Sequence, residues 1–249
     1  MTPEPASPQP GVHALFAERA ADLTRSIDRH LMASRAMIDQ LAVLRKSLAQ
    51  RLFTVGIGHR TFKTSPIGDI PAEWDVTSLG EIARLASGRA KPKDASYLRS
   101  PSHAVPIYGG KGILGFSGSS LRGGDTIVVG RVGAHCGAVH FVSDEACWIT
   151  DSALFVYETR PEVDLRFLYH SLCQRNLASL RNMGRQPLIS LSTIYPVLLP
   201  LPPLAEQREI CGVLSCVETL MEAERKVVGQ ATTLRSLLFA DARSGNPSD

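Results

Sequence analysis

The sequence predicts an α+β fold in which one globular domain, with a mixed β-sheet and helices, is flanked by two long amphipathic helices. Three features support this prediction. Residues 12–53 and 203–243 are long amphipathic segments without proline beyond the first turn. Residues 70–202 instead contain short β-rich runs separated by Gly, Ser and Pro. The two amphipathic segments are also related to each other by an internal repeat.

The chain starts with a proline-rich stretch. Residues 1–11 contain four prolines and almost no apolar side chains, which predicts a disordered tail. From residue 12 to residue 53, apolar side chains recur at three- and four-residue steps, which predicts a helix of about 60 Å. Residues 54–69 are then expected to be a linker, and residues 244–249 a second tail.

The helix predicted at 203–243 repeats the first one. A shift of 190 residues places 27–48 on 217–238 without a gap, and six of the 22 pairs are identical. The apolar seams coincide under the same shift, which favours duplication over two unrelated amphipathic helices. The residues expected to pack between the helices are Leu23, Ile27, Leu41, Leu44, Leu48, Val213, Val217, Leu234 and Leu238.

The middle of the chain is expected to hold a mixed β-sheet with helices. Strands are predicted at 126–130, 137–142, 153–157 and 193–199, which are rich in β-branched and aromatic residues. Asp164 is a suitable N-cap for a helix that extends to about residue 183, with Gly184 as its stop signal.

Composition excludes several classes of protein. Lys and Arg number 27 against 24 Asp and Glu, so the net charge is only +3. The sequence contains no apolar run near the roughly 20 residues of a membrane-spanning helix and no signal-peptide pattern at its start. Its five cysteines are scattered and form no CxxC motif, so a reducing cytoplasm is expected.

The motifs that resemble catalytic or cofactor sites lack the context that their chemistry needs. Residues 110–115 match GxGxxG, but a Gly- and Ser-rich stretch follows where a dinucleotide site requires a helix, so we expect a surface loop. His135, Cys136, His140 and Cys147 do not form the two close ligand pairs of a structural zinc site. The sequence also contains no nucleophile elbow. We therefore predict no catalytic residue, metal or cofactor in this chain.

Cations on glycine-bounded loops are more informative. Arginine can contact O6 and N7 of guanine together, lysine can neutralise phosphates, and a glutamine amide can contact adenine. The candidate DNA-binding residues are Arg89, Lys91, Lys93, Tyr97, Tyr108, Lys111, Arg131, His135, Arg185 and Gln186. Because residues 75–200 hold 13 Lys and Arg against 10 Asp and Glu, an ordinary solvated surface is the alternative.

Four stretches of the sequence carry a resemblance to a known family. They are residues 48–59, residues 68–81, residues 105–133, and residues 189–210, the last of which ends in Leu-Pro-Pro-Leu-Ala-Glu-Gln-Arg-Glu-Ile. In this order they resemble the specificity subunit of type I restriction–modification enzymes, a component of phage defence. The resemblance covers about residues 12–243.

This resemblance implies a DNA-reading adaptor rather than an enzyme. Family members usually carry two target-recognition domains, and their two long helices pair as an antiparallel coiled coil that holds the domains on two half-sites at a fixed spacing. Methylation and restriction subunits dock on this scaffold and supply the chemistry of S-adenosylmethionine, ATP and Mg²⁺. With one such domain, this chain resembles a half-sized subunit. A second copy or another partial subunit is then expected to read the other half-site.

Two other classes of function are alternatives to this one. An interaction or anti-restriction protein would occupy the methylation subunit without reading DNA. A stand-alone enzyme of the methyltransferase class is disfavoured, because the sequence contains no cofactor or catalytic motif.

Overall fold

The computed structural model describes residues 10–144, 146–182 and 187–244, with the side chains of residues 10–17 and 239–244 excepted. The chain divides into two compact units, Met1–Ser47 with Leu214–Asp249, and Leu48–Val213. Helix α1 (Pro10–Val55) and helix α5 (Leu204–Ser244) each contribute to both units. The two long helices are thus confirmed, whereas the predicted terminal tails fall mostly outside the described residues.

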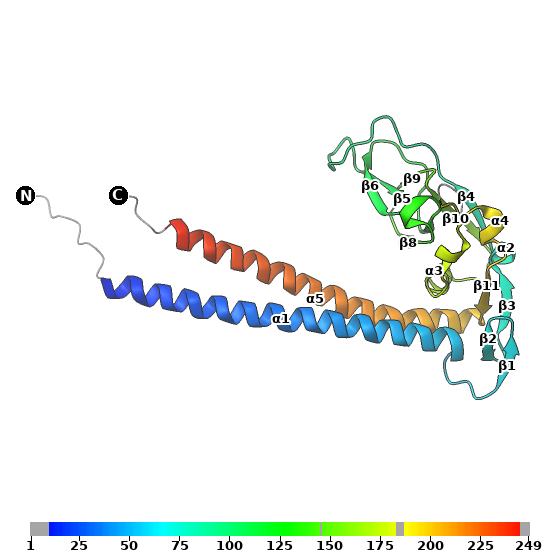
Figure 1. The fold of residues 1–249 in the computed structure, drawn as a ribbon, viewed down its shortest axis with the longest axis horizontal. Helices are drawn as coiled ribbons and strands as arrows, with labels where there is room; N and C mark the ends of the chain where they lie inside the picture. Colours follow the sequence, from blue (N-terminus) through cyan, green and yellow to red (C-terminus); the bar gives the residue numbers. More distant parts are fainter. Residues whose placement is uncertain (1–9, 145, 183–186, 245–249) are drawn as a thin grey trace, which may run out of the picture. The chain divides into compact units, whose positions relative to one another are not determined.

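In the first unit, α1 and α5 run side by side in opposite directions (Figure 1). Arg45 donates to Glu218 at 2.7 Å, and Arg235 donates to Asp28 at 2.8 Å. The 190-residue shift converts Asp28 into Glu218 and Arg45 into Arg235, so one ion pair is the copy of the other. The helix pair therefore has an internal two-fold axis, which supports the predicted duplication.

The predicted seam has two apolar positions in each heptad. One of them, the set with Ile27 and Val217, lies in the seam of the structure, and the other does not. Ile27 and Val217 are buried as predicted. Leu41, Leu48 and Leu238 are half-buried. The remaining predictions are wrong, because Leu23, Leu44, Val213 and Leu234 are 46%, 46%, 37% and 47% exposed. The buried positions in their place include Leu31 and Met221, which lie four residues after Ile27 and Val217.

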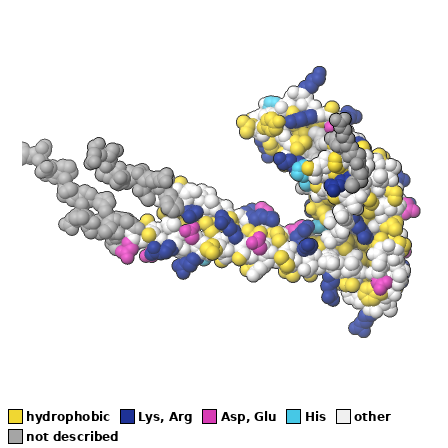
Figure 2. Space-filling model, in the orientation of Figure 1, with side chains coloured by type: hydrophobic (Ala, Val, Ile, Leu, Met, Phe, Trp, Pro, Cys, Tyr) yellow, Lys and Arg dark blue, Asp and Glu magenta, His cyan; other side chains and the backbone are white. Residues whose placement is uncertain are grey.

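The error has a physical cause. Both helices carry apolar side chains at both the third and the fourth residue after some shared seam positions, such as Ser34 on α1 and Val217 on α5, and both spacings return to one helix face. The structure uses the four-residue step and leaves the other set exposed. We call this exposed set the outer stripe: Leu23, Met37 and Leu44 on α1, and Val213, Leu220, Val227 and Leu234 on α5. On the visible face of the helices, hydrophobic side chains lie among charged ones (Figure 2).

Truncation at the buried seam is expected to destabilise the helix pair. Leu31 is 4% exposed, so Leu31→Ala should lower the free energy of unfolding by about 2–5 kcal/mol. Its neighbour Met32 is 72% exposed, so Met32→Ala should change it by less than about 0.5 kcal/mol. Urea denaturation followed by far-ultraviolet circular dichroism measures both. Equal losses would contradict this seam.

The described residues of the second unit form four sheets. Two are two-stranded: β1 (Phe62–Ser65) with β2 (Gly68–Pro71), and β3 (Asp75–Ser78) with β11 (Leu198–Leu201). The central antiparallel sheet has the order β4 (Ala83–Ser87), β10 (Ala153–Thr159), β7 (Thr126–Gly130) and β8 (Val139–Val142). The last sheet has the order β6 (Gly112–Ser117), β5 (Val105–Gly109) and β9 (Trp148–Ile149). The predicted linker 54–69 thus contains β1 and the start of β2.

Short helices complete this unit. They are α2 (Leu79–Ile82), the 3₁₀ helix η1 (Gly133–His135), α3 (Leu165–Cys173), the 3₁₀ helix η2 (Leu177–Leu180) and α4 (Leu191–Ile194). Asp164 caps α3 as predicted, because its carboxylate accepts hydrogen bonds from the amides of Arg166 and Phe167. The predicted extension of this helix to residue 183 is wrong, since α3 ends ten residues earlier at Cys173. Asn176, a poor helix former, then precedes η2.

The predicted strand 193–199 is wrong in its first half. Ser190 and Thr193 cap one another, which starts helix α4 where the sequence suggested an extended chain. Only residues 198 and 199 of the predicted segment belong to β11.

Strand β7 is buried on both faces. Ile127 and Val129 belong to the main core, together with Leu168 and Leu172 of α3. Val128 points to the opposite face, where Val142, Cys147, Ile149 and Ala153 form a second cluster. Burial on both faces explains why β7 is a continuous apolar run rather than an alternating one.

A single carboxylate joins the start of α5 to the segments that follow α1. Glu206 Oε1 accepts the amide of Ile57 at 3.0 Å and lies 2.8 Å from Nε2 of His59. Its Oε2 accepts the indole N–H of Trp74 at 2.8 Å, and Trp74 is fully buried. These residues come from three of the stretches that carry the family resemblance.

The next residue makes a second set of ties. The amide oxygen of Gln207 accepts the backbone N–H of Asp164, which caps α3, at 2.8 Å. Its amide nitrogen donates to the carbonyls of Glu162 and Pro202, also at 2.8 Å. Because Gln207 is 1% exposed and both ends of its amide are bonded, it fixes the chain before α3 relative to the start of α5.

Two nearby glycines provide a matched test of this arrangement. Gly56 and Gly58 both have positive φ, at 65° and 75°. A Cβ at Gly56 would lie 2.5 Å from Glu206 Oε1 and 2.7 Å from Trp74, whereas a Cβ at Gly58 would meet nothing within 4 Å. Gly58→Ala should therefore lower the free energy of unfolding by about 1–2 kcal/mol, the cost of the left-handed backbone. Gly56→Ala should lower it clearly further, as measured by urea denaturation followed by tryptophan fluorescence. Equal losses would mean that the Glu206 contacts are not tightly packed.

Candidate nucleic-acid interface

One edge of the central sheet collects loops from distant parts of the chain. Strands β4 and β7 both pair antiparallel with β10, and β8 pairs antiparallel with β7. The ends of β4 and β7 therefore lie at the same edge as the starts of β10 and β8. The segments that follow β4 and β7 carry Arg89, Arg131 and His135.

Arg89 is held at this edge by its backbone. Its N–H donates to the carbonyl of Ile149 at 2.9 Å, and its carbonyl accepts the N–H of Asp151 at 2.9 Å. Its side chain is exposed. The position of the residue is thus fixed while the guanidinium can contact a ligand.

Arg131 connects the ends of β7 and β4. Its Nη1 donates to Ser87 Oγ at 2.9 Å. Its backbone is bound on both sides, since its N–H donates to Ser152 and its carbonyl accepts the N–H of Ile189 and the thiol of Cys136. Its Nε is buried and has no hydrogen-bond partner within the described part of the chain.

Close glycine packing brings Lys111 beside His135. A Cβ at Gly110 would lie 3.0 Å from the Cα of Gly130, and a Cβ at Gly130 would lie 2.1 Å from the carbonyl oxygen of His135. The carbonyl of Gly110 also lies 2.9 Å from Nε2 of His140 on β8. The turn between β5 and β6 is thereby fastened to the same edge, with the Lys111 and His135 side chains exposed. We call Arg89, Lys111, Arg131 and His135 the edge cluster.

Lys91, Lys93 and Tyr97 lie on a segment that is attached to β6. Ser96 and Phe116 exchange two backbone hydrogen bonds, of 2.8 and 2.7 Å. Lys91 Nζ lies 4.9 Å from the centroid of the Tyr97 ring, and Tyr97 is 84% exposed. An exposed aromatic ring with a cation over it offers a surface that can stack on a base or contact the DNA backbone.

Asp94 fastens the segment that carries Lys91, Lys93 and Tyr97 to the end of β6. Its carboxylate accepts hydrogen bonds from Ser117 Oγ and from the amide of Gly118 at 2.8–3.0 Å. The Gly118 amide and the Ser117 hydroxyl stabilise the charged form and hold the pKa of Asp94 below its usual value.

Two predicted residues lie outside the described part of the chain, and one is already hydrogen-bonded. Arg185 and Gln186 fall in the segment that the structure does not describe. Just after it, the carbonyl of Pro187 accepts the N–H of Gly133 at 3.0 Å. Tyr108 is half-buried, and its hydroxyl donates to Asp144 at 2.6 Å. Burial and this carboxylate raise the pKa of Tyr108 above its ordinary value.

Arg181 was not among the DNA-binding candidates predicted from the sequence. It was assigned to the interior of a helix, but the structure places it after η2, close enough to Cys136 to oppose the rise in the pKa of that thiol. Burial is the larger influence and raises the pKa of Cys136, while Arg181 and Arg131 act in the opposite direction. Arg181 is exposed and adds a cation near the edge cluster. Only a correct end of α3 would have revealed it.

The cluster has the chemistry of a surface that binds nucleic acid. It offers cations and hydrogen-bond donors, which match phosphates and base edges. In the part of the chain that the structure describes, no three His, Cys, Asp or Glu side chains gather as metal ligands would. Nor is any described helix both long and apolar enough to cross a bilayer. The GxGxxG match at residues 110–115 forms the turn between β5 and β6 and the first half of β6.

Comparison with known proteins places the chain among specificity subunits. The type I restriction enzyme MjaVIII specificity subunit of Methanocaldococcus jannaschii is 22% identical over 235 residues, which cover 84% of this chain and 55% of that protein. The EcoprrI specificity subunit of Escherichia coli is 25% identical over 151 residues, 60% of this chain and 37% of that protein. The chain spans about half the length of the curated relatives that match most of it.

The fold is shared with solved structures. The S subunit of the type I restriction–modification system from M. genitalium superimposes with a TM-score of 0.64 at 19% identity, over 88% of this chain and 58% of that one. The model of the type I restriction modification DNA specificity domain family matches residues 71–229, which include all the described members of the edge cluster and the start of α5. The chain therefore belongs to the type I restriction modification DNA specificity domain family.

Proposed function

We propose that this chain reads one half-site of DNA for a type I restriction–modification complex. The observation that carries the proposal is the edge cluster. Arg89, Lys111, Arg131 and His135 come from three separate loops, and the strand order of the sheet and the glycine packing bring these loops together. A solvated surface requires no such convergence, and membership of the family supports a role in DNA recognition.

The residues are proposed to differ in what they contact. Arg89 and Arg131 are suited to guanine, because the guanidinium can contact O6 and N7 at once. Lys91, Lys93 and Lys111 are flexible point charges suited to phosphates, which position the protein without reading sequence. Gln186 stays a candidate for adenine contact.

In this proposal the chemistry belongs to other subunits. A methylation subunit would use S-adenosylmethionine, and a restriction subunit, where present, would use ATP and Mg²⁺. A second recognition domain, from another copy or another partial specificity subunit, would read the second half-site. With two copies of the chain, the two half-sites would be related by two-fold symmetry.

The outer stripe is the surface that we assign to the methylation subunit. Apolar residues recur every seven residues on α5 and, apart from His30, at the equivalent positions of α1 under the 190-residue shift, yet those of α5 are 37–56% exposed from 213 to 234. A heptad repeat of exposed apolar side chains is typical of a helix that packs against another helix.

The role proposed for the edge cluster is tested by DNA affinity. Methylation-sensitive sequencing of the host genome would identify the target, and binding is measured on that duplex with the assembled complex. Arg131→Ala should cost about 1–3 kcal/mol and relax one base position, if it reads a base. Lys111→Ala should weaken all sequences alike and reduce the salt dependence of binding by about one ion.

Lys63→Ala serves as the control, because Lys63 is an exposed cation of β1 and does not belong to the edge cluster. It should leave affinity unchanged. The assignment of the edge cluster to DNA fails if Lys111→Ala and Arg131→Ala bind the target as the unmodified chain does.

The role proposed for the outer stripe is tested by assembly. Met37→Ser combined with Leu44→Ser removes outer-stripe side chains that are each 46% exposed, and it should weaken association with the methylation subunit tenfold or more. Met32→Ser combined with Val43→Ser removes apolar side chains that are 72% and 68% exposed but lie off the stripe, and should have little effect. Analytical ultracentrifugation of the mixtures compares the two. Equal weakening by both pairs would rule out the stripe as the docking surface.

A further inference from the structure

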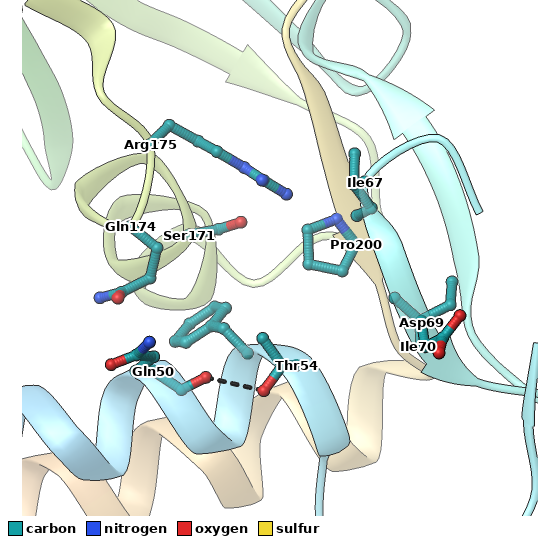
Figure 3. Close-up of a pocket in the computed structure, with 10 residues that line it drawn as sticks. Gln50, Thr54, Ile67, Asp69, Ile70, Ser171, Gln174, Arg175 and Pro200 are labelled. Carbon is teal, nitrogen blue, oxygen red and sulfur yellow. Dashed lines mark hydrogen bonds between the residues drawn. The ribbon is translucent and has the colours of Figure 1, made fainter. Parts of the chain in front are cut away.

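A small pocket in the second unit contains no residue of the edge cluster. It is lined by the end of α1, the β1–β2 hairpin, the end of α3 and strand β11 (Figure 3). Its volume is about 120 Å³, which is room for roughly four water molecules or one short side chain. Phe53, Ile67, Ile70 and Pro200 supply an apolar wall. The Phe53 ring is fixed by stacking on Phe167 at a centroid distance of 4.9 Å.

Two donors at the other side of the pocket have no acceptor among the residues that the structure describes. Ser171 is 1% exposed, and its hydroxyl has no hydrogen-bond partner among the described residues. Arg175 Nε is likewise buried without a partner there. Figure 3 shows the Arg175 side chain extending across the pocket toward Pro200, with the Ser171 hydroxyl pointing the same way. Desolvation lowers the pKa of Arg175, as expected for a guanidinium that is partly buried without a neutralising carboxylate.

Leaving buried donors without acceptors is costly, and the cost is greatest for a charged group. A ligand that brings a negative charge and two acceptor oxygens would satisfy both donors, and a planar carboxylate matches the fork of a guanidinium. The apolar wall suits a short aliphatic stem. At the rim the residues are Gln50, Thr54, Asp69 and Gln174, so among the lining residues no second cation faces a multiply charged phosphate, and Asp69 would repel a doubly charged phosphate more strongly than a singly charged carboxylate.

We propose that this pocket binds a carboxylate on a short aliphatic stem, with Arg175 and Ser171 holding the carboxylate and Phe53 and Ile70 packing on the stem. A free short-chain acid and a glutamate side chain of a bound protein share this chemistry. None of the residues that line the pocket belongs to the edge cluster, so the proposal does not depend on the role assigned to that cluster.

The test titrates the full chain with butyrate and, in parallel, with its neutral isostere butyramide, using saturation-transfer NMR. A ligand of this size is expected to bind in the millimolar range. Butyrate should bind and butyramide should not. Arg175→Gln should weaken butyrate about tenfold or more, and Ser171→Ala should weaken it to a smaller extent. Arg208→Gln is the matched control, since Arg208 is exposed and does not line the pocket, and it should leave binding unchanged.

Three outcomes would overturn the proposal: butyramide binding as well as butyrate, butyrate binding that survives Arg175→Gln, or inorganic phosphate binding more tightly than butyrate. The first and third are read on the unmodified chain, so they stand even if a variant fails to fold. Glutamate blocked at both its amino and carboxyl backbone groups distinguishes the two sources. Tighter binding of blocked glutamate assigns the pocket to a protein side chain, and tighter binding of butyrate assigns it to a free acid.

Discussion

Glu206 binds three hydrogen-bond donors that lie 132 to 149 residues earlier in the chain, on Ile57, His59 and Trp74. Beside it, Gln207 binds the backbone on both sides of Val163, so two adjacent residues at the start of α5 tie together the segments at residues 57–74 and 162–164. A buried carboxylate is stable only while its donors stay in place, which ties these distant segments to one geometry. Three of the four stretches that carry the family resemblance therefore meet at Glu206, whereas the remaining one, residues 105–133, contains Lys111 and Arg131 of the edge cluster and lies outside these ties.

The long helices show how far periodicity carries a prediction. Their extents and their duplication could be predicted, because an uninterrupted amphipathic pattern and a gapless internal shift are local properties of the sequence. The choice of seam could not. Leu23 and Leu44 compete with Leu31 and Ile38 for the same helix face, and only the partner helix decides which set is buried. The ion pairs Arg45–Glu218 and Arg235–Asp28 occur at equivalent positions of the two helices and fit the observed seam.

The cations of the candidate interface could be named from the sequence, but their arrangement in space could not. Loop cations such as Lys111 and Arg131 are visible from composition and glycine spacing. Their convergence depends on strand order, which pairs β4 and β7 with β10 over long sequence separations and leaves no local trace. Arg175 and Ser171 had no signal at all, because polar residues near the end of an amphipathic helix usually face solvent. Only the packing of α3 near the end of α1 encloses them.

The intramolecular pairing of α1 with α5 also sets the order in which the apolar seam is covered during synthesis. Ile27 and Leu31 leave the ribosome about 190 residues before the equivalent seam of α5, a delay of roughly 10–40 s at ordinary translation rates. Throughout that interval the first helix has a complete seam and no partner. A neighbouring nascent chain on the same messenger RNA presents a matching helix before the first chain has synthesised its own α5. The duplication therefore makes pairing between two chains kinetically available before pairing within one chain.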